Sequence, residues 1–229
     1  MKKYISAVAA TICIISTSTL AAATLNSNTD KLSYTIGFKT GQAMKARDVK
    51  INTNVFAKAL ADGYQGKKAS LSDKEMQTTL ADMQKKMMAK MQAKFKDLAN
   101  KNAATGKEFL AKNAKKPGVV TTKSGLQYQI LKKGTGTSPS STDTVTVNYQ
   151  GSLIDGTVFD SSYKRKKPAT FKVDQVIKGW QQALTKMKPG ATWMIYIPSD
   201  LAYGAQGSFG KIGPNETLIF KVNLISVKK

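Results

Sequence analysis

The five residues Val176-Ile177-Lys178-Gly179-Trp180 decide how the C-terminal half of the chain is interpreted. They place a large indole one helical turn after two aliphatic residues, and apolar and aromatic residues that could line a cavity occur before and after them. The pattern predicts a short helix over residues 175–187, stopped by Pro189-Gly190. We expect this helix to be the floor of a pocket.

On both sides of this helix the hydrophobic pattern has a period of two. Alternating runs bounded by turn residues indicate strands. We predict strands at residues 126–131, 145–150, 158–160, 169–173, 192–198 and 217–227. One short helix among such strands predicts an α+β domain, in which a curved antiparallel sheet wraps around the helix.

The first 23 residues have the features of a secretory signal. Lys2 and Lys3 precede an apolar run over residues 5–15, and Ala21-Ala22-Ala23 follow it. Because the run is too short to span a bilayer, we expect cleavage near Ala23, with a retained N-terminal anchor as the alternative. Cys13, the chain's one cysteine, lies in this segment, so the mature protein suits an oxidising compartment. We therefore expect secretion across the inner membrane, to the periplasm or the outer membrane and cell surface.

The chain is strongly basic. It has 36 Lys and Arg against 14 Asp and Glu, and without Lys2 and Lys3 the count is 34 against 14, a net charge of +20. Such an excess predicts attraction to anionic surfaces or nucleic acid that salt weakens. Because the lysines are spread over both halves, we favour a basic envelope protein and expect no specific nucleic-acid partner. The absence of histidine excludes Ser-His and Cys-His catalysis and argues against the usual zinc sites.

Residues 24–71 are expected to form an all-α N-terminal domain. Asn28-Thr29-Asp30 can cap a helix that ends near Arg47-Asp48. A second short helix should follow Asn52-Thr53 and close at Gly63 or Gly66. Two helices this short cannot bury much apolar surface alone.

Residues 72–116 are predicted to form one long linking helix. Ser72-Asp73-Lys74-Glu75 is a capping box, and at 1.5 Å per residue a helix to Lys115 would be roughly 65 Å long. Apolar residues recur along it at steps of three and four; this Met-rich stripe consists of Met76, Leu80, Met83, Met87, Met91, Phe95 and Leu98. Pro117-Gly118 marks the boundary to a domain over residues 117–229.

The Met-rich stripe has two interpretations. It can be ordinary core packed on the two short helices, or a partner surface, since methionine is common at adaptable interfaces. We expect both: the stripe begins against the short helices and a second chain completes it, giving a homodimer through this N-terminal dimerisation domain. The rest of the helix, diluted by Lys94, Lys96, Lys101, Lys107 and Lys112, is predicted to be a solvated spacer.

A sheet curved over the short helix would gather a set of apolar and aromatic side chains. They are Tyr149, Phe159, Phe171 and Phe220 from four strands, Val176, Ile177 and Trp180 from the helix, and Tyr203 from a glycine-rich loop. Such a cluster can be core alone, but two features favour a pocket. Asp160 would be costly in an apolar setting unless it is paired, and loops as long as residues 201–214 are often functional.

Several motifs in this half resemble the FKBP family of peptidyl-prolyl cis-trans isomerases, in order and spacing, over about residues 126–227. They are Tyr149-Gln150-Gly151, Gly156-Thr157-Val158-Phe159-Asp160-Ser161-Ser162, Val176-Ile177-Lys178-Gly179-Trp180, Pro198-Ser199-Asp200-Leu201-Ala202-Tyr203-Gly204 and Thr217-Leu218-Ile219-Phe220. The signal, the helical segment and the long helix look like the Mip-type (macrophage infectivity potentiator) branch, found in the envelope of Gram-negative bacteria.

The resemblance implies an FKBP-like fold and a rotamase that binds X-Pro segments of polypeptides and macrolides of the FK506 and rapamycin type. It implies that Tyr149, Phe159, Phe171, Val176, Ile177, Trp180, Tyr203 and Phe220 line the pocket. Trp180 would lie under the proline ring and Asp160 at the pocket edge, while Tyr203 and the backbone N–H of Ile177 would donate hydrogen bonds. No metal, cofactor or covalent intermediate is expected.

The sequence departs from the family pattern at two places. Ser208 occupies a position that is histidine in well-known single-domain members, and the loop over residues 163–167 is longer and more basic. Arg165, in that loop, is a candidate partner for Asp160. Both departures bear on substrate preference more than on activity. The alternative function is a chaperone-like or polyanion-binding module that uses the Met-rich helical cleft or the basic surface.

Overall fold

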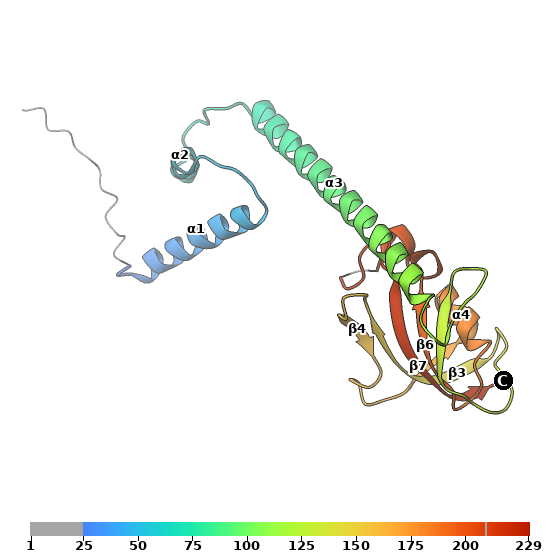
Figure 1. Cartoon of the computed structure of the whole chain (residues 1–229). Helices are drawn as coiled ribbons and strands as arrows, with labels where there is room; N and C mark the ends of the chain where they lie inside the picture. The colour runs from blue at the N-terminus through green and yellow to red at the C-terminus, as the bar shows by residue number, and fades with distance from the viewer. Residues whose placement is uncertain (1–24, 209) are drawn as a thin grey trace, which may run out of the picture. The chain divides into compact units, whose positions relative to one another are not determined.

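The computed structural model describes residues 25–208 and 210–229, and the chain divides into two compact units, residues 1–73 and 74–229. Figure 1 shows the helices of the first unit in blue to teal and the sheet domain in yellow-green to red. The predicted signal segment, residues 1–23, lies outside the described residues. None of the helices among the described residues is both long and apolar enough to cross a membrane.

The first unit contains α1 (Asn28–Ala46) and α2 (Thr53–Tyr64). Ser27 caps α1 in a reciprocal capping box with Asp30, one residue before the cap that the sequence predicted. α2 begins at Thr53, one residue earlier than the sequence predicted, and the side chain of Asn52 caps it. Within the described part of this unit, neither helix buries a residue. The apolar side chains of these helices are therefore not covered in a single chain.

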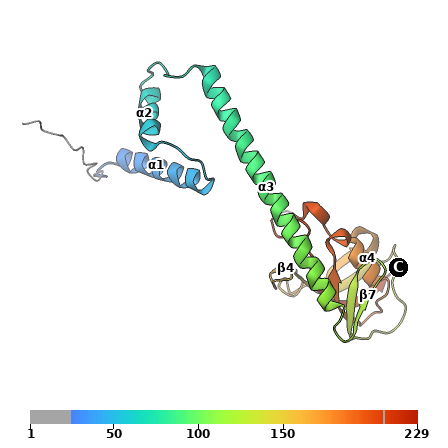
Figure 2. The same cartoon turned by 45° about the horizontal axis from the view of Figure 1, so that its top comes forward.

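The second unit begins with α3 (Asp73–Asn113), a helix of 41 residues. Its buried residues, Gly106 and Asn113, both lie in the C-terminal third. Both views show this end of α3 alongside the sheet domain (Figure 1 and Figure 2). The ring of Phe109 lies 6.0 Å from that of Tyr196, centroid to centroid.

The last part of α3 is thus not the solvated spacer that its lysines predicted. Asn113 Nδ2 donates to Gln127 Oε1 at 3.0 Å, and Gln127 Nε2 donates to the carbonyl oxygen of Leu110 at 2.9 Å. The lysines of this part are exposed, while residues at helical spacing between them face the domain. Small and amide side chains made this contact face hard to distinguish from a polar surface.

The domain is one antiparallel sheet of seven strands. In chain order they are β1 (Val119–Thr121), β2 (Gln127–Lys132), β3 (Thr144–Ser152), β4 (Val158–Ser161), β5 (Ala169–Lys172), β6 (Thr192–Ile197) and β7 (Leu218–Lys228). Their spatial order is β1-β2-β6-β7-β3-β4, and β5 pairs with β3 beside β4. The six predicted strands are all present, and the sequence missed β1, which has three residues.

The predicted pocket helix is shorter than expected. A turn of 3-10 helix, η1 (Val173–Gln175), precedes α4 (Lys178–Leu184), and Ile177 is the N-cap residue of α4. Val176 and Ile177 have extended backbones, with ψ of 170° and 149°. The expectation that these two residues belong to the helix is therefore wrong. Their branched side chains favour extended backbone, which the apolar spacing did not reveal.

The α4 helix packs closely on the sheet because its second residue is glycine. A Cβ at Gly179 would lie 2.4 Å from Cγ2 of Ile197, a fully buried residue of β6. Leu184, Met187 and Trp193 join the same core. The short helix is thereby fixed against the sheet, with Trp180 at its pocket end.

Candidate active site

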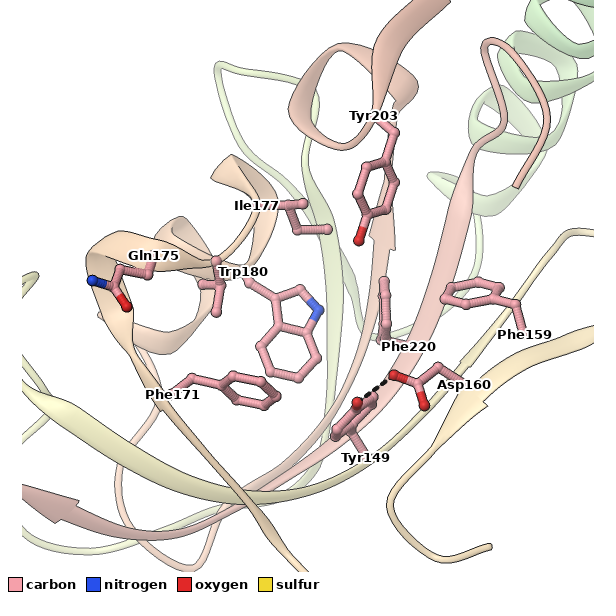
Figure 3. A pocket seen from close by; sticks show the side chains of 10 residues that line it. Tyr149, Phe159, Asp160, Phe171, Gln175, Ile177, Trp180, Tyr203 and Phe220 are labelled. Atoms are coloured by element: carbon pink, nitrogen blue, oxygen red, sulfur yellow. Dashed lines mark hydrogen bonds between the residues drawn. The ribbon is translucent and has the colours of Figure 1, made fainter. Parts of the chain in front are cut away.

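A cavity of about 320 Å³ opens between α4, the sheet and the loop after β6. Ten residues line it: Tyr149, Phe159, Asp160, Phe171, Gln175, Val176, Ile177, Trp180, Tyr203 and Phe220 (Figure 3). Every predicted pocket residue is among them. They come from β3, β4, β5, β7, the segment before α4, α4 itself and the loop that carries Tyr203.

Trp180 is held by rings that meet it edge to face. The rings of Tyr149, Phe171 and Phe220 lie 5.2, 5.9 and 5.3 Å from its ring, with interplanar angles of 89°, 84° and 84°. Aromatic pairs prefer this geometry. Trp180 is only 4% exposed, yet it lines the cavity. It is therefore a fixed apolar surface that is available from the cavity.

A glycine allows two walls of the cavity to meet. In β3, Gly151 pairs with Asp160 of β4 on one side and with Phe220 of β7 on the other. A Cβ at Gly151 would lie 2.6 Å from the ring of Phe220 and 2.7 Å from that of Phe159. Those two rings pack at a centroid distance of 5.5 Å. The contact between them requires glycine at this position.

Among the described residues that line the cavity, Asp160 is the one with an ionisable carboxyl group. It accepts hydrogen bonds from the hydroxyl of Tyr149 and from Nη1 of Arg165, and Arg165 Nη2 donates to the Tyr149 oxygen at 2.9 Å. Arg165, the partner suggested by the sequence, thus forms an ion pair with Asp160. The three side chains form a closed polar cluster at the edge of an otherwise apolar cavity.

The cluster keeps its charges at neutral pH. Burial alone would raise the pKa of Asp160, but the hydrogen bonds from Tyr149 and Arg165 and the charge of Arg165 outweigh it and lower that pKa. Burial, followed by the hydrogen bond to Asp160, raises the pKa of Tyr149. Asp160 therefore stays an anion and Tyr149 stays a neutral donor.

Two hydrogen-bond donors at the cavity have no partner in the described part of the chain. Nothing in it accepts from the backbone N–H of Ile177 or the hydroxyl of Tyr203. Figure 3 shows the Tyr203 hydroxyl pointing from the loop toward the cavity. Nε1 of Trp180 is also buried without a partner among the described groups. The cavity is therefore apolar, with donors available to a carbonyl.

The sequence missed two residues near the cavity. Gln175 lines it from the η1 turn, directly before Val176. Lys211 lies in the turn closed by the bridge between Ser208 and Ile212, and its Nζ donates to the carbonyl oxygen of Phe159 at 3.3 Å. Both are exposed polar residues, a type that hydrophobic spacing cannot select.

Comparisons with known proteins agree with this geometry. Residues 135–225 match the family model for FKBP-type peptidyl-prolyl cis-trans isomerase, and residues 29–130 match that for the domain amino terminal to it. The peptidyl-prolyl cis-trans isomerase Mip of Coxiella burnetii is 52% identical over 229 residues, which is 100% of both chains. The outer membrane protein MIP of Legionella longbeachae is 50% identical over 226 residues, 97% of both.

A solved structure extends the likeness to the fold. The crystal structure of FkpA from Escherichia coli has a TM-score of 0.75 and 38% sequence identity, and the match covers 89% of this chain and 98% of that one. The full-length identity to Mip proteins and the match to both family models show that this chain belongs to the FKBP-type peptidyl-prolyl cis-trans isomerases, in their Mip-like branch.

Proposed function

We propose that this isomerase acts on X-Pro bonds of proteins in the bacterial envelope, by binding the proline ring on Trp180 and the adjoining carbonyls through Tyr203 and Ile177. The observation that carries the proposal is the ring-lined cavity with its two unpartnered donors. Asp160 holds Tyr149 and Arg165 at the edge of this cavity. In this proposal Asp160, Tyr203 and Ile177 form the catalytic group, and the aromatic walls bind substrate.

The proposed mechanism uses no covalent step. Rotation about an X-Pro amide passes through a twisted state without resonance, about 18–20 kcal/mol above the planar one, and takes tens of seconds or more unaided. A planar amide has more charge separation than a twisted one. An apolar cavity therefore disfavours the planar ground state more than the twisted state. The Tyr203 hydroxyl and the Ile177 N–H can hold carbonyl oxygens while the bond turns. A barrier lower by roughly 4 kcal/mol gives about a thousandfold acceleration.

A macrolide of the FK506 or rapamycin type should compete with substrate for the cavity. We expect the mature protein to accelerate cis-trans exchange of a short X-Pro peptide, and one equivalent of the macrolide to abolish that acceleration. Binding should also change the emission of Trp180. The other tryptophan, Trp193, stacks on Tyr128 at a centroid distance of 4.4 Å and does not line the cavity. A full rate in saturating macrolide would contradict the assignment of this cavity.

Localisation in the envelope is supported by the outer membrane protein name of the Legionella longbeachae relative and by the secretory pattern of residues 1–23. We also propose that the working form is a homodimer. The large apolar residues Leu32, Ile36 and Leu60 of the first unit are 61%, 59% and 64% exposed in one chain. In the Met-rich stripe, Leu80 and Met91 are 61% and 68% exposed. Apolar surfaces of this extent mark association sites.

A charge placed in the Met-rich stripe should separate the dimer. Met91→Glu would leave a carboxylate unpaired in an apolar interface, so we expect the mass in solution to fall to that of one chain. The matched control is Gln92→Glu, which adds the same charge to an exposed residue about 100° around α3 from Met91. Light scattering reads the mass directly. A wild-type chain that is monomeric, or a Met91→Glu chain that stays dimeric, would contradict this interface.

The same exposed residues support a second candidate, a chaperone-like surface that grips unfolded chains. The two candidates differ in what Met91→Glu changes. Under the dimer proposal the variant keeps its activity on short peptides and loses mass. Under the chaperone proposal it keeps its mass and suppresses aggregation of an unfolded protein less well than wild type.

A further inference from the structure

The loop that carries Tyr203 is anchored on α3. We call the described residues 203–208 and 210–217 the Tyr203 loop. Near its end, the backbone N–H of Asn215 donates to the carbonyl oxygen of Gly204 at 2.9 Å, which closes the loop beside Tyr203. The side-chain Nδ2 of the same Asn215 donates to the carbonyl oxygen of Ala99 in α3 at 3.3 Å. One residue therefore links the start of the loop to the long helix.

Other contacts hold the end of the loop on α3. Asn102 Nδ2 donates to the carbonyl oxygen of Pro214 at 2.8 Å. A Cβ at Gly106 would lie 2.4 Å from Oγ1 of Thr217, so only glycine lets the helix approach the loop so closely. Thr217 is 3% exposed. The base of the loop is thus in direct contact with the C-terminal part of α3, at Asn102 and Gly106.

The conformation of Asn215 fits this linking position. Its φ is 55°, in the left-handed region that asparagine tolerates better than most residues. In this conformation its backbone N–H donates to the carbonyl oxygen of Gly204, and its side-chain amide donates to the carbonyl oxygen of Ala99. Replacement by a residue without the amide would remove the bond to Ala99. A β-branched residue would be strained at this φ and would weaken the backbone bond to Gly204.

The position of Tyr203 depends on this backbone. Its side chain is 41% exposed, and no hydrogen bond to the hydroxyl is found among the described residues. Figure 3 shows the ring extending from the loop toward the cavity. Because the side chain has no polar anchor of its own, the place of its hydroxyl is set by the loop backbone, and Gly204 is the next residue along that backbone.

We propose that Asn215 is a positioning residue for Tyr203, and that the segment of α3 from Ala99 to Gly106 is a structural part of the isomerase site. This inference rests on the proposed role of Tyr203 as a hydrogen-bond donor. It goes further than that role because it makes α3, a helix outside the sheet, responsible for the position of the Tyr203 hydroxyl. A displacement of about 1 Å in a reacting group can lower a rate by about a hundredfold.

A double-mutant cycle in the full chain tests the proposal. Asn215→Gly accepts the positive φ and removes the side chain with its amide, and Tyr203→Phe removes only the hydroxyl. We expect Asn215→Gly to lower kcat/KM on a short X-Pro peptide by about fivefold in the wild-type background and not at all in the Tyr203→Phe background, because it acts through that hydroxyl. Asn102→Asp, which removes the other donor, should behave in the same way.

The control is Gln127→Met, which breaks the contact of α3 with β2 and does not touch the loop. It should lower the melting temperature and leave kcat/KM per folded molecule unchanged, as a purely structural contact would. All rates are measured where each variant is fully folded by circular dichroism.

The outcomes separate this proposal from the one it rests on. If Tyr203→Phe has the wild-type rate, the donor role of Tyr203 is wrong and the inference falls with it. If Tyr203→Phe is impaired but Asn215→Gly is not, only the inference is overturned. It is also overturned if Asn215→Gly costs the same factor in both backgrounds, because the residue would then act independently of Tyr203.

Discussion

Replacing Asp160 by leucine is expected to lower kcat/KM for a short X-Pro peptide by about tenfold or more while the domain still folds, since hydrogen bonds to charged groups are worth about 1.5–3 kcal/mol. Leucine has the same number and branching of side-chain heavy atoms but leaves the hydroxyl of Tyr149 and the guanidinium of Arg165 without their acceptor. The cavity would then lose the carboxylate that holds the side chains of Tyr149 and Arg165 at its edge. Protease-coupled peptide isomerisation measures the rate, and circular dichroism checks the fold.

Asp155→Leu is the matched control for Asp160→Leu. It removes a carboxylate from the turn before β4, where Asp155 accepts from the N–H of Thr157 and does not line the cavity. We expect this control to keep the wild-type rate. Equal rates for Asp160→Leu and wild type would remove Asp160 from the site, and an equal loss in both variants would show that only the charge of the domain matters.

The largest expected effect on stability comes from Gly179→Ala. The added methyl would sit 2.4 Å from Cγ2 and 2.9 Å from Cδ1 of Ile197, a residue with no exposed surface. Overpacking of this kind costs about 1–3 kcal/mol. For a unit of this size the melting temperature should fall by about 2–4 °C for each kcal/mol. Differential scanning calorimetry measures that shift, and the emission of Trp180 reports the displacement of α4.

A second substitution identifies the clash as the cause. Ile197→Ala removes all three of the side-chain atoms that the new methyl would meet. Alone it should destabilise by leaving a cavity, but in combination with Gly179→Ala the loss should be smaller than the sum of the two single losses. Strict additivity, or an unchanged melting temperature in Gly179→Ala, would show that α4 can shift without cost.

The sheet could be predicted from the sequence because its strands alternate strongly. Residues such as Val145, Val147 and Tyr149 are buried at every second position of β3. By contrast, β1 is too short for a period to be recognised. At Val176 and Ile177 the apolar spacing predicted a helix where the backbone is extended. The spacing of apolar residues indicates which residues are buried together. It does not distinguish the residues of a helix from those of the extended segment that directly precedes it.

The aromatic residues of the site and the pair Asp160–Arg165 were predictable from the sequence, while its other polar residues were not. Phe159, Phe171 and Phe220 were expected at the cavity because large apolar side chains on strands are usually buried against another element. Gln175 and Lys211 carry no such signal. The contact of α3 with the domain was missed for a related reason: Asn102, Asn113 and Gln127 bond across it. The sequence alone does not show whether an amide side chain donates its hydrogen bonds to water or to a carbonyl oxygen of the protein.

The three rings packed edge-on against Trp180 have a consequence for affinity. Because Tyr149, Phe171 and Phe220 all abut the indole, it cannot tilt to accommodate a guest unless the others move as well. The receptor is therefore preorganised, and little conformational entropy is lost on its side when a ligand enters. Differences in affinity among ligands should then follow the rigidity of the ligands themselves. A cyclic molecule that already holds the shape of a bound prolyl segment would bind more tightly than a flexible peptide with the same contacts.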